Sequence, residues 1–447
     1  MACIDMGTKS FLSKKSTVLF IRGDKVRGVT SHNNRSAALL PAGSGNSPAI
    51  PLYVLVLALT IGNTMASMAL MILPAVAPAV ARDYGVDASL IGYQISVVGA
   101  GLLTALLLVG NLSRKLGGCR TNQLGHGMVA LGMLFMQLPS MAILVPGSLA
   151  MGFGFGLLGP SHSSLMMRFA PAARRNLVFS IQQTSVPLGG ILAASVAPLI
   201  AVTFGWRWAL AFNACLLFAV IAMLQRGRPC WDDDRVPSTP AIVKNPFAGF
   251  LANWRDRRLR LLSISGGAFC WAQFCVAAYT VVTCVEALGM NLIVAGTVLM
   301  VVQLCNAAGR MVAGWLADRL QNAALLLAWM GWIMLATCIA SIWLAPSWDA
   351  LLIYVLFSLL GITSGAWPGI LMAEVGRLAP TGHVSAVVSG MLVYVNIGKL
   401  LGPMAFAATY ALTRSYGIAF GSVGVPALLA IYCLTAVQRE KSNLFVS

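Results

Sequence analysis

The sequence predicts an all-α protein whose helices cross a membrane many times. Of its 447 residues, 58% are hydrophobic and only 10% are charged, whereas about a quarter of the residues in a soluble globular protein are charged. So few charges cannot cover the surface of a water-soluble protein of this length, and most of that surface must therefore face lipid. The composition excludes a soluble enzyme, a disordered scaffold and a secreted disulfide module.

Long apolar runs predict where the chain crosses the membrane. A helix needs about 20 apolar residues to cross the hydrocarbon core, and runs of that kind predict twelve spans in two sets of six. The spans are expected at 52–78, 88–109, 121–138, 141–163, 180–203, 207–225, 262–286, 291–316, 323–344, 349–372, 384–410 and 417–437. The domains are expected to be a disordered basic tail at 1–48, a six-helix bundle at 49–225, a linker at 226–260, a second bundle at 261–437 and a tail at 438–447.

The basic residues predict the orientation of the chain. With the N-terminus inside, nearly every Lys and Arg of the loops falls on the inner side, and only Arg82, Arg207 and Arg414 fall outside. Cytoplasmic loops carry such an excess of Lys and Arg. We therefore expect both termini in the cytoplasm, with the protein in the cell or inner membrane. The net charge of +17 then reflects topology and not nucleic-acid binding.

The sequence offers no sign of an enzyme or of a cofactor. Most of the ten cysteines lie inside apolar runs and none forms a CxxC pair, so buried free thiols are expected. No GxxxxGK[ST] loop and no metal-ligand cluster occur, so neither ATP drive nor a bound metal is expected. Because no nucleophile–base group lies within the spans, we expect that the protein is not an enzyme.

The two halves of the chain repeat one another. A set of positions that starts at Gly85 recurs 204 residues later, and a set from Arg168 to Gly189 recurs 209 residues later. Duplication followed by drift in loop length would leave such nearly constant offsets. Two six-helix halves related by a parallel repeat are typical of secondary transporters.

Four short motifs carry a resemblance to a known family. Gly110-Asn-Leu-Ser-Arg-Lys-Leu-Gly117 follows the second span, and Gly314-Trp-Leu-Ala-Asp-Arg319 follows the eighth. Gly152-x-Gly154-x-Gly156 lies on the fourth span, and Gly205-Trp-Arg-Trp208 opens the sixth. In this order and spacing the motifs resemble the major facilitator superfamily, which implies its fold and transport of a small molecule by a membrane-embedded monomer.

Further positions indicate which members of the family the chain resembles and where it departs from the family's motifs. Gln182-Gln-Thr-Ser-Val-Pro-Leu-Gly189 is similar to a segment of cyanate-permease-like members, with Gln182 in place of a lysine. The drug-antiporter signature of the fifth span is not matched, because Pro187 stands at the wrong distance from the following glycines. Arg114 stands where the family's first loop has an aspartate, and Ser148 stands where the fourth span often has an arginine.

Two cations are expected deep in the membrane. Ionisable residues within spans are costly and usually functional, and here every carboxylate is expected in a loop, a tail or a helix end, which leaves Arg310 and Lys399. A cavity with two cations and no acid attracts anions, and the planar fork of Arg310 suits an oxyanion. Lys399 could add attraction or carry a coupling proton. The alternatives are that Arg310 pairs with Asp318 and that Lys399 reaches water at the membrane surface.

Neutral side chains could complete a binding site. Gln303, Asn306 and Arg310 share one helical face on the eighth span. The alternatives are that such amides only bond neighbouring helices and that the aromatic residues only pack. His126 and His162 could titrate near neutrality, although such residues near helix ends are more often simply hydrogen-bonded. The predicted substrate-binding residues are Arg310, Lys399, Asn63, Gln182, Gln183, Gln303, Asn306, Asn396, Tyr394 and Trp367.

Charged loop residues predict a cytoplasmic gate. If family packing holds, Asp318 lies beside a basic loop that contains Arg168, Arg174 and Arg175. Such contacts would stabilise the outward-facing state and break when the halves rock. The alternative is that these charges only set topology. The predicted gate residues are Asp318, Arg319, Arg114, Lys115, Arg168 and Arg377.

These observations predict a secondary transporter that moves a small organic or inorganic anion by alternating access, with proton coupling. Its expected partners are that anion, protons and the lipid bilayer, without nucleic acid. Two alternatives stay open. One is an efflux antiporter for drugs or metabolites, and the other is a membrane sensor that binds its ligand without moving it.

Overall fold

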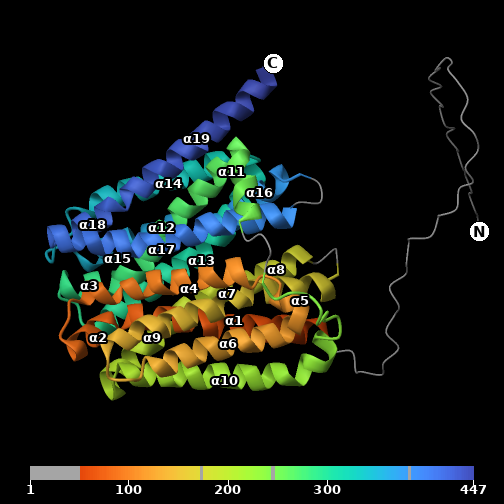
Figure 1. Cartoon of the computed structure of the whole chain (residues 1–447). Helices are drawn as coiled ribbons and strands as arrows, with labels where there is room; N and C mark the ends of the chain where they lie inside the picture. The colour runs from red at the N-terminus through yellow and green to blue at the C-terminus, as the bar shows by residue number, and fades with distance from the viewer. Residues whose placement is uncertain (1–50, 172–174, 243–246, 381–383, 447) are drawn as a thin grey trace, which may run out of the picture. The chain divides into compact units, whose positions relative to one another are not determined.

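The computed structural model describes residues 51–446, except 172–174, 243–246 and 381–383. The predicted N-terminal tail, 1–48, lies outside the described residues. Within the described ranges all regular structure is helical and no strand occurs, as the composition predicts (Figure 1).

The first half of the chain forms one group of helices in Figure 1. They are α1 (Leu52–Ala75), α2 (Ala77–Tyr84), α3 (Ala88–Ile91), α4 (Tyr93–Leu108), α5 (Leu112–Leu116), α6 (Gly118–Phe135), the short 3₁₀ helix η1 (Met141–Ile143), α7 (Leu144–Phe169), α8 (Arg175–Gln183), α9 (Ser185–Phe204) and α10 (Trp206–Trp231).

The second half forms the other group. It consists of α11 (Ala248–Arg255), α12 (Arg257–Glu286), α13 (Leu292–Leu320), α14 (Ala323–Ser341), α15 (Ala350–Gly365), α16 (Trp367–Leu378), α17 (Val384–Thr413), α18 (Tyr416–Ser422) and α19 (Gly424–Val446). The segment expected to be a linker, 226–260, is therefore partly helical, because α10 continues to Trp231 and α11 lies inside it.

Eleven helical segments in the described chain are long and apolar enough to cross a membrane. The predicted span 121–138 corresponds to α6, whose 18 residues extend about 27 Å at 1.5 Å per residue. Its first turns carry Arg120, Asn122 and Gln123, which makes it more polar than the other eleven. Several spans are broken in the middle. One break lies at Ala366 between α15 and α16, where Pro368 follows in the first turn of α16.

The glycine ladder on α7 brings three helices together. A Cβ at Gly152 would lie 2.0 Å from the carbonyl oxygen of Val98 on α4, and one at Gly154 would lie 2.5 Å from that of Gly125 on α6. Successive small residues therefore allow α4 and α6 to approach α7 on two different faces. The motif that resembles the family is, in this chain, a packing device.

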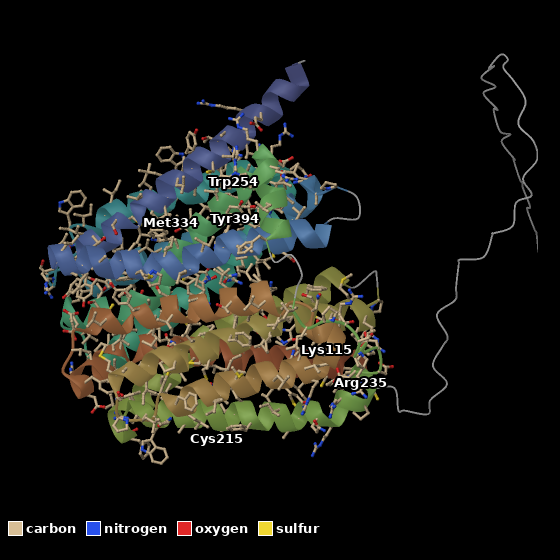
Figure 2. All side chains as sticks on the ribbon, viewed as in Figure 1. Lys115, Cys215, Arg235, Trp254, Met334 and Tyr394 are labelled. Carbon is tan, nitrogen blue, oxygen red and sulfur yellow. The ribbon has the colours of Figure 1, made fainter. Side chains whose placement is uncertain are left out.

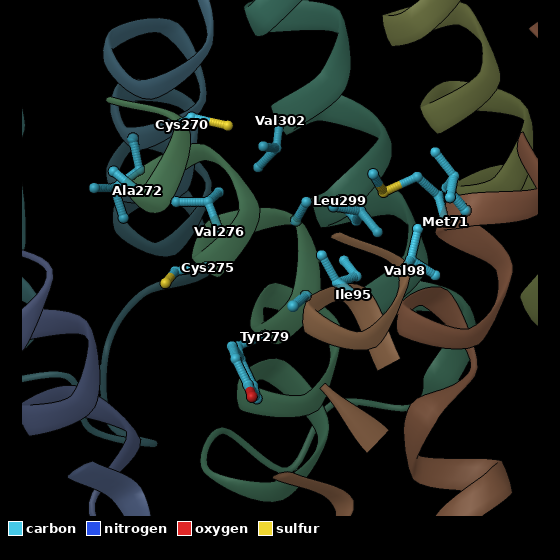
Figure 3. Packing of buried hydrophobic residues seen from close by; sticks show 14 of the residues in the cluster. Met71, Ile95, Val98, Cys270, Ala272, Cys275, Val276, Tyr279, Leu299 and Val302 are labelled. Carbon is cyan, nitrogen blue, oxygen red and sulfur yellow. The ribbon is translucent and has the colours of Figure 1, made fainter. Parts of the chain in front are cut away.

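The two halves share an apolar core (Figure 3). Ile95 and Val98 of α4, Leu299 and Val302 of α13 and residues of α12 all belong to this core, in which Gly99 of α4 packs on Leu400 of α17 and Gly296 of α13 packs on Ala194 of α9. A buried tyrosine, Tyr279 of α12, donates a hydrogen bond to the carbonyl oxygen of Pro403 at 2.9 Å. Helices from the two halves are thus packed directly against each other, so a change in their relative tilt must rearrange this core.

The end of the bundle where α1 begins and α19 ends, to the right in Figure 1, is called the termini side below, and the other end the opposite side. The halves are joined by an ion pair on the opposite side, where Arg414 Nη1 lies 3.2 Å from Asp87 Oδ2. Nearby, the Tyr279 hydroxyl lies 3.4 Å from the carbonyl oxygen of Ser89. On the termini side, every ion pair within the described residues stays inside one half. The conformation is therefore closed on the opposite side.

Candidate functional site

Arg310 is fixed at the break between α15 and α16. Its Nε donates to Asn306 Oδ1 at 3.0 Å and to the carbonyl oxygen of Gly365 at 3.1 Å. A Cβ at Gly365 would lie 2.2 Å from the Asn306 side chain, so glycine is required there. Asn306 and Arg310 thus lie on one face of α13, and Nε is occupied by neutral oxygens. Within the described residues neither Nη group of Arg310 has a hydrogen bond or an ion pair.

Lys399 lies between aromatic rings from both halves. Its Nζ is 4.3 Å from the ring centre of Phe274 on α12 and 5.5 Å from that of Phe155 on α7. The residue is 3% exposed, and no carboxylate pairs with it among the residues that the structure describes. The two ring faces stabilise a cation at this point, at the boundary between the halves.

A hydrogen bond of Trp367 connects the helix break with α12. Trp367, the first residue of α16, donates from Nε1 to Gln273 Oε1 at 3.1 Å. Gln273 precedes Phe274, the residue whose ring lies next to Lys399. Since α16 begins two residues after Gly365, the helix break supports Arg310 on one side and the α12 face near Lys399 on the other.

The first half contributes a chain of neutral hydrogen bonds. Asn63 of α1 donates to Ser185 Oγ at 2.5 Å, and Ser185 donates to the carbonyl oxygen of Gln182 at 2.5 Å. The side-chain nitrogen of Gln182 lies 3.1 Å from His162 Nδ1 on α7. Two predicted binding residues, Asn63 and Gln182, are therefore brought together by Ser185.

The remaining predicted binding residues lie at separate places. Gln303 packs against Gly190 of α9, where a Cβ would lie 2.0 Å from its amide nitrogen. Asn396 donates to its own helix, at Leu392 O, 2.7 Å away. Gln183 is exposed. Tyr394 stacks on Phe250 of α11 at 4.5 Å between ring centres, near Trp254 in Figure 2.

Arg168, expected at a gate, pairs inside its own half in this conformation. Its guanidinium contacts Asp233, and Nη1 lies 3.0 Å from Asp234 Oδ1. Asp318 is exposed and forms no ion pair with a described residue. The expected contact between Asp318 and the basic loop belongs to the other conformation, so it stays a prediction. Arg174 and the side chain of Arg175 lie outside the described residues.

The other predicted gate residues also have local partners. Arg319 lies over the Trp315 ring at 4.6 Å, and Arg377 pairs with Glu374 one turn earlier. Glu374 is buried within the segment 350–378 that is apolar enough to span, whereas every carboxylate was expected outside the spans. Its ion pair with Arg377 satisfies its charge near the helix end.

The segment after α10 holds the start of α6. Asp232 Oδ1 accepts from the backbone N–H of Cys119 at 2.7 Å, and Oδ2 accepts from that of Arg120 at 3.0 Å. Burial raises the pKa of the Asp232 carboxyl, while these donors and Arg228 oppose the rise. Four residues after Asp232, Val236 N–H donates to the carbonyl oxygen of Arg114 at 2.8 Å. Lys115 and Arg235 line one small pocket there (Figure 2).

Sequence reasoning missed four residues that surround the predicted ones: Phe155, Phe274, Ser185 and Gln273. A signal existed for Phe155, because it directly precedes Gly156 of the glycine ladder on the fourth span. For Phe274 and Gln273 no local signal distinguishes them from other residues of a long apolar run. Their position depends on which helices meet.

The chain is similar to known membrane transporters. A family model described as Major Facilitator Superfamily matches residues 59–403. Over 133 residues the chain is 34% identical to dipeptide and tripeptide permease B of Edwardsiella piscicida, which is 28% of this chain and 26% of that permease. The chain thus spans about a quarter of the length of that relative.

Two longer similarities cover most of the chain. A gallate transporter of Pseudomonas putida is 22% identical over 394 residues, 81% of this chain and 86% of that protein. The crystal structure of a peptide transporter, POT, in complex with sulfate superposes with a TM-score of 0.70 at 16% identity, over 86% of this chain and 94% of the other.

Proposed function

The chain belongs to the major facilitator superfamily, and we propose that it is a secondary transporter that carries a small organic anion together with protons. As an integral, multi-pass membrane protein it would expose the site between its halves to one side of the membrane at a time. We place both termini in the cytoplasm, because few basic residues lie on the opposite side.

The observation that carries the proposal is the pair of unneutralised cations. Arg310 leaves its two Nη groups without a protein partner in the described chain, and Lys399 lies beside two aromatic rings and forms no ion pair with a described residue. A buried charge without a partner is costly. A bound carboxylate could accept two parallel hydrogen bonds from Arg310, with Lys399 adding attraction.

An aromatic carboxylate fits the surroundings of Lys399. Phe155 and Phe274 offer ring faces from the two halves, and aromatic rings pair well in offset or edge-to-face contacts. The gallate transporter of Pseudomonas putida is a relative along most of the chain. We therefore propose gallate and similar benzoates as the first substrates to test.

The proposal favours an anion over the lipophilic cations of many drugs. No carboxylate lies next to Arg310 or Lys399 among the described residues, and a cation would be repelled there. A sensor that binds without transport shares the same site, so binding alone cannot separate it from a transporter.

A thermal-shift assay of the purified protein tests the choice of ligand. A ligand that binds only the folded protein raises the melting temperature with concentration. Gallate, benzoate and sulfate are compared with tetraphenylphosphonium, in the wild type and in Arg310→Gln. We expect stabilisation by an anion that is lost in the variant. Stabilisation by tetraphenylphosphonium alone would contradict the proposal.

A further inference from the structure

Two buried histidines have no role in the anion site. His126 on α6 is 0% exposed and His162 on α7 is 2% exposed. They flank a hydrogen bond between these helices, from Asn122 Nδ2 to Ser161 Oγ at 3.0 Å. The same hydrogen bond connects the two histidines, because Asn122 also bonds His126 and Ser161 directly precedes His162. Neither lies at a helix end, where a histidine bonds readily to free backbone groups.

The hydrogen bonds of the rings determine where their protons lie. His126 Nδ1 is 2.8 Å from the carbonyl oxygen of Asn122, and because a carbonyl only accepts, Nδ1 carries the proton. His126 Nε2 is then an unprotonated base. The amide nitrogen of Gln182 can only donate to His162 Nδ1, so the proton of His162 is on Nε2. Both Nε2 atoms are buried and lack a partner in the described chain.

Three buried groups of the cluster lack a partner among the described residues, namely two acceptors and the Nε2–H donor of His162. Asn122 Oδ1 and His126 Nε2 are both buried acceptors without a donor among the described residues. Buried acceptors are normally satisfied, and leaving one without a partner costs free energy. One added proton on His126 Nε2 converts an unsatisfied acceptor into a donor.

No carboxylate is available to neutralise that proton. The helices that carry or contact the cluster, α1 and α5 to α10, contain no Asp or Glu. The ring of His126 faces Gly62 of α1 and Val220 of α10. The charged groups on these helices are cationic and lie toward their ends, with side chains described for Arg114, Lys115, Arg120, Arg168, Arg207, Arg226 and Arg228.

We propose that His126 Nε2 is the proton-binding site of the transport cycle and that the charge of a proton bound there acts on the neighbouring ring of His162. The proposal rests on the function proposed above. A hydronium ion on one side of the membrane gives its proton to the ring nitrogen, which forms imidazolium and leaves water, and the proton later passes to a water molecule on the other side. A negative substrate supplies the missing countercharge, so anion and proton favour each other's binding.

The geometry connects the histidines to the anion site. His162 follows Phe155 by seven residues, which places both on one face of α7 about 10 Å apart along the axis. Phe155 lies beside Lys399, and Gln182, which bonds His162, leads through Ser185 to Asn63. Helix α7 thus leads from the anion site to the proton site, and the hydrogen bonds of Gln182 connect His162 with Asn63 of α1.

Titration of ¹⁵N-histidine spectra tests the proton site directly. Wild type, His126→Asn and Ser161→Ala are compared in detergent between about pH 8 and 5, the range in which histidine titrates, with and without gallate. Asparagine can still donate to Asn122 O, and Ser161→Ala disturbs the cluster without removing a basic nitrogen. We expect one ring to change from the Nδ1–H form to imidazolium, in wild type and Ser161→Ala only. A His126 ring that stays neutral throughout would overturn the proposal.

Transport assays test the coupling. In proteoliposomes, His126→Asn should lose the stimulation of labelled gallate uptake by an inward proton gradient, while gallate exchange at equal pH is weakened by the loss of the coupled proton but stays measurable. Ser161→Ala should keep both. Gradient-driven uptake that persists in His126→Asn would refute the coupling role. If wild type moves no gallate in either assay, the proposed function fails with this substrate, and the titration still decides the proton site.

Discussion

The Nε atom of Arg310 lies 3.1 Å from the carbonyl oxygen of Gly365, at the end of α15. The broken helix thus presents a free backbone acceptor within the bundle, and Arg310 satisfies it. Because Nε and not the Nη groups makes this contact, the guanidinium fork stays available for a ligand. Charge and helix break together define the proposed anion site.

Substitution of Arg310 should lower the affinity for the anion more than it lowers the stability of the folded protein. Arg310→Gln removes charge-assisted hydrogen bonds worth about 1.5–3 kcal/mol, so the apparent affinity should fall about 10- to 100-fold. Arg310→Lys keeps the charge but not the planar fork, so its anion affinity should lie between those of the wild type and Arg310→Gln. Titration of gallate by thermal shift measures this. Equal affinities in wild type and Arg310→Gln would contradict the assignment.

Lys399 should contribute electrostatic attraction to the bound anion. Lys399→Met keeps a long, flexible side chain between Phe155 and Phe274 but removes the cation, so anion affinity should fall about tenfold. Lys115→Met, which removes a cation outside the site, serves as the matched control and should bind like wild type. A Lys399→Met variant with unchanged affinity would show that its charge does not act on the ligand.

The acidic segment after α10 should influence the conformational equilibrium. While Asp233 and Asp234 hold Arg168, that arginine is not available to Asp318. The double variant Asp233→Asn, Asp234→Asn should therefore favour closure on the termini side, by about threefold for exposed ion pairs of this kind.

Spin labels on cysteines placed at Met167 and Leu320, with the native cysteines replaced, report that change as a larger population at short distance. Glu440→Gln, which breaks an ion pair inside the second half, is the control and should leave the distances unchanged. A double variant with the wild-type distance distribution would argue against competition for Arg168.

Two glycines of α7 should respond oppositely to the same substitution. Gly152→Ala forces a Cβ against the Val98 carbonyl oxygen, and such overpacking costs about 1–3 kcal/mol. Gly159→Ala meets no atom within 4 Å, and alanine favours a helix by about 1 kcal/mol. Melting temperatures should fall for the first and stay level or rise for the second. A stable Gly152→Ala would mean that α4 and α7 are not packed so closely.

The fold could be predicted from the sequence because every helix that crosses the bilayer needs a long apolar run. Apolar runs marked the spans, and only α6 departs, since Asn122 in its first turns donates to Ser161 of α7 and Gln123 donates to Ile221 and Gln225 of α10. The helix breaks were harder. At Ala366 the local signal is Pro368 in the first turn of α16, whereas the contacts of Arg310 and Asn306 with Gly365 depend on tertiary packing.

The candidate site was predictable only where its contacts are local to one helix. Spacing placed Asn306 and Arg310 on one face, because that relation is local to α13. The contact of Tyr394 with Phe250 and the pairing of Arg168 with Asp233 involve the segment between the halves, whose position is set by tertiary packing. His126 and His162 each appeared alone in the sequence, and only the packing of α6 on α7 brings them into one cluster.

Uptake by reconstituted wild-type protein tests the central claim most directly. Proteoliposomes are given labelled gallate or tetraphenylphosphonium, with and without an inward proton gradient, and protein-free liposomes serve as the blank. We expect saturable gallate uptake that rises with the gradient and no saturable movement of the cation. Gradient-dependent movement of tetraphenylphosphonium without any response to gallate would contradict an anion transporter.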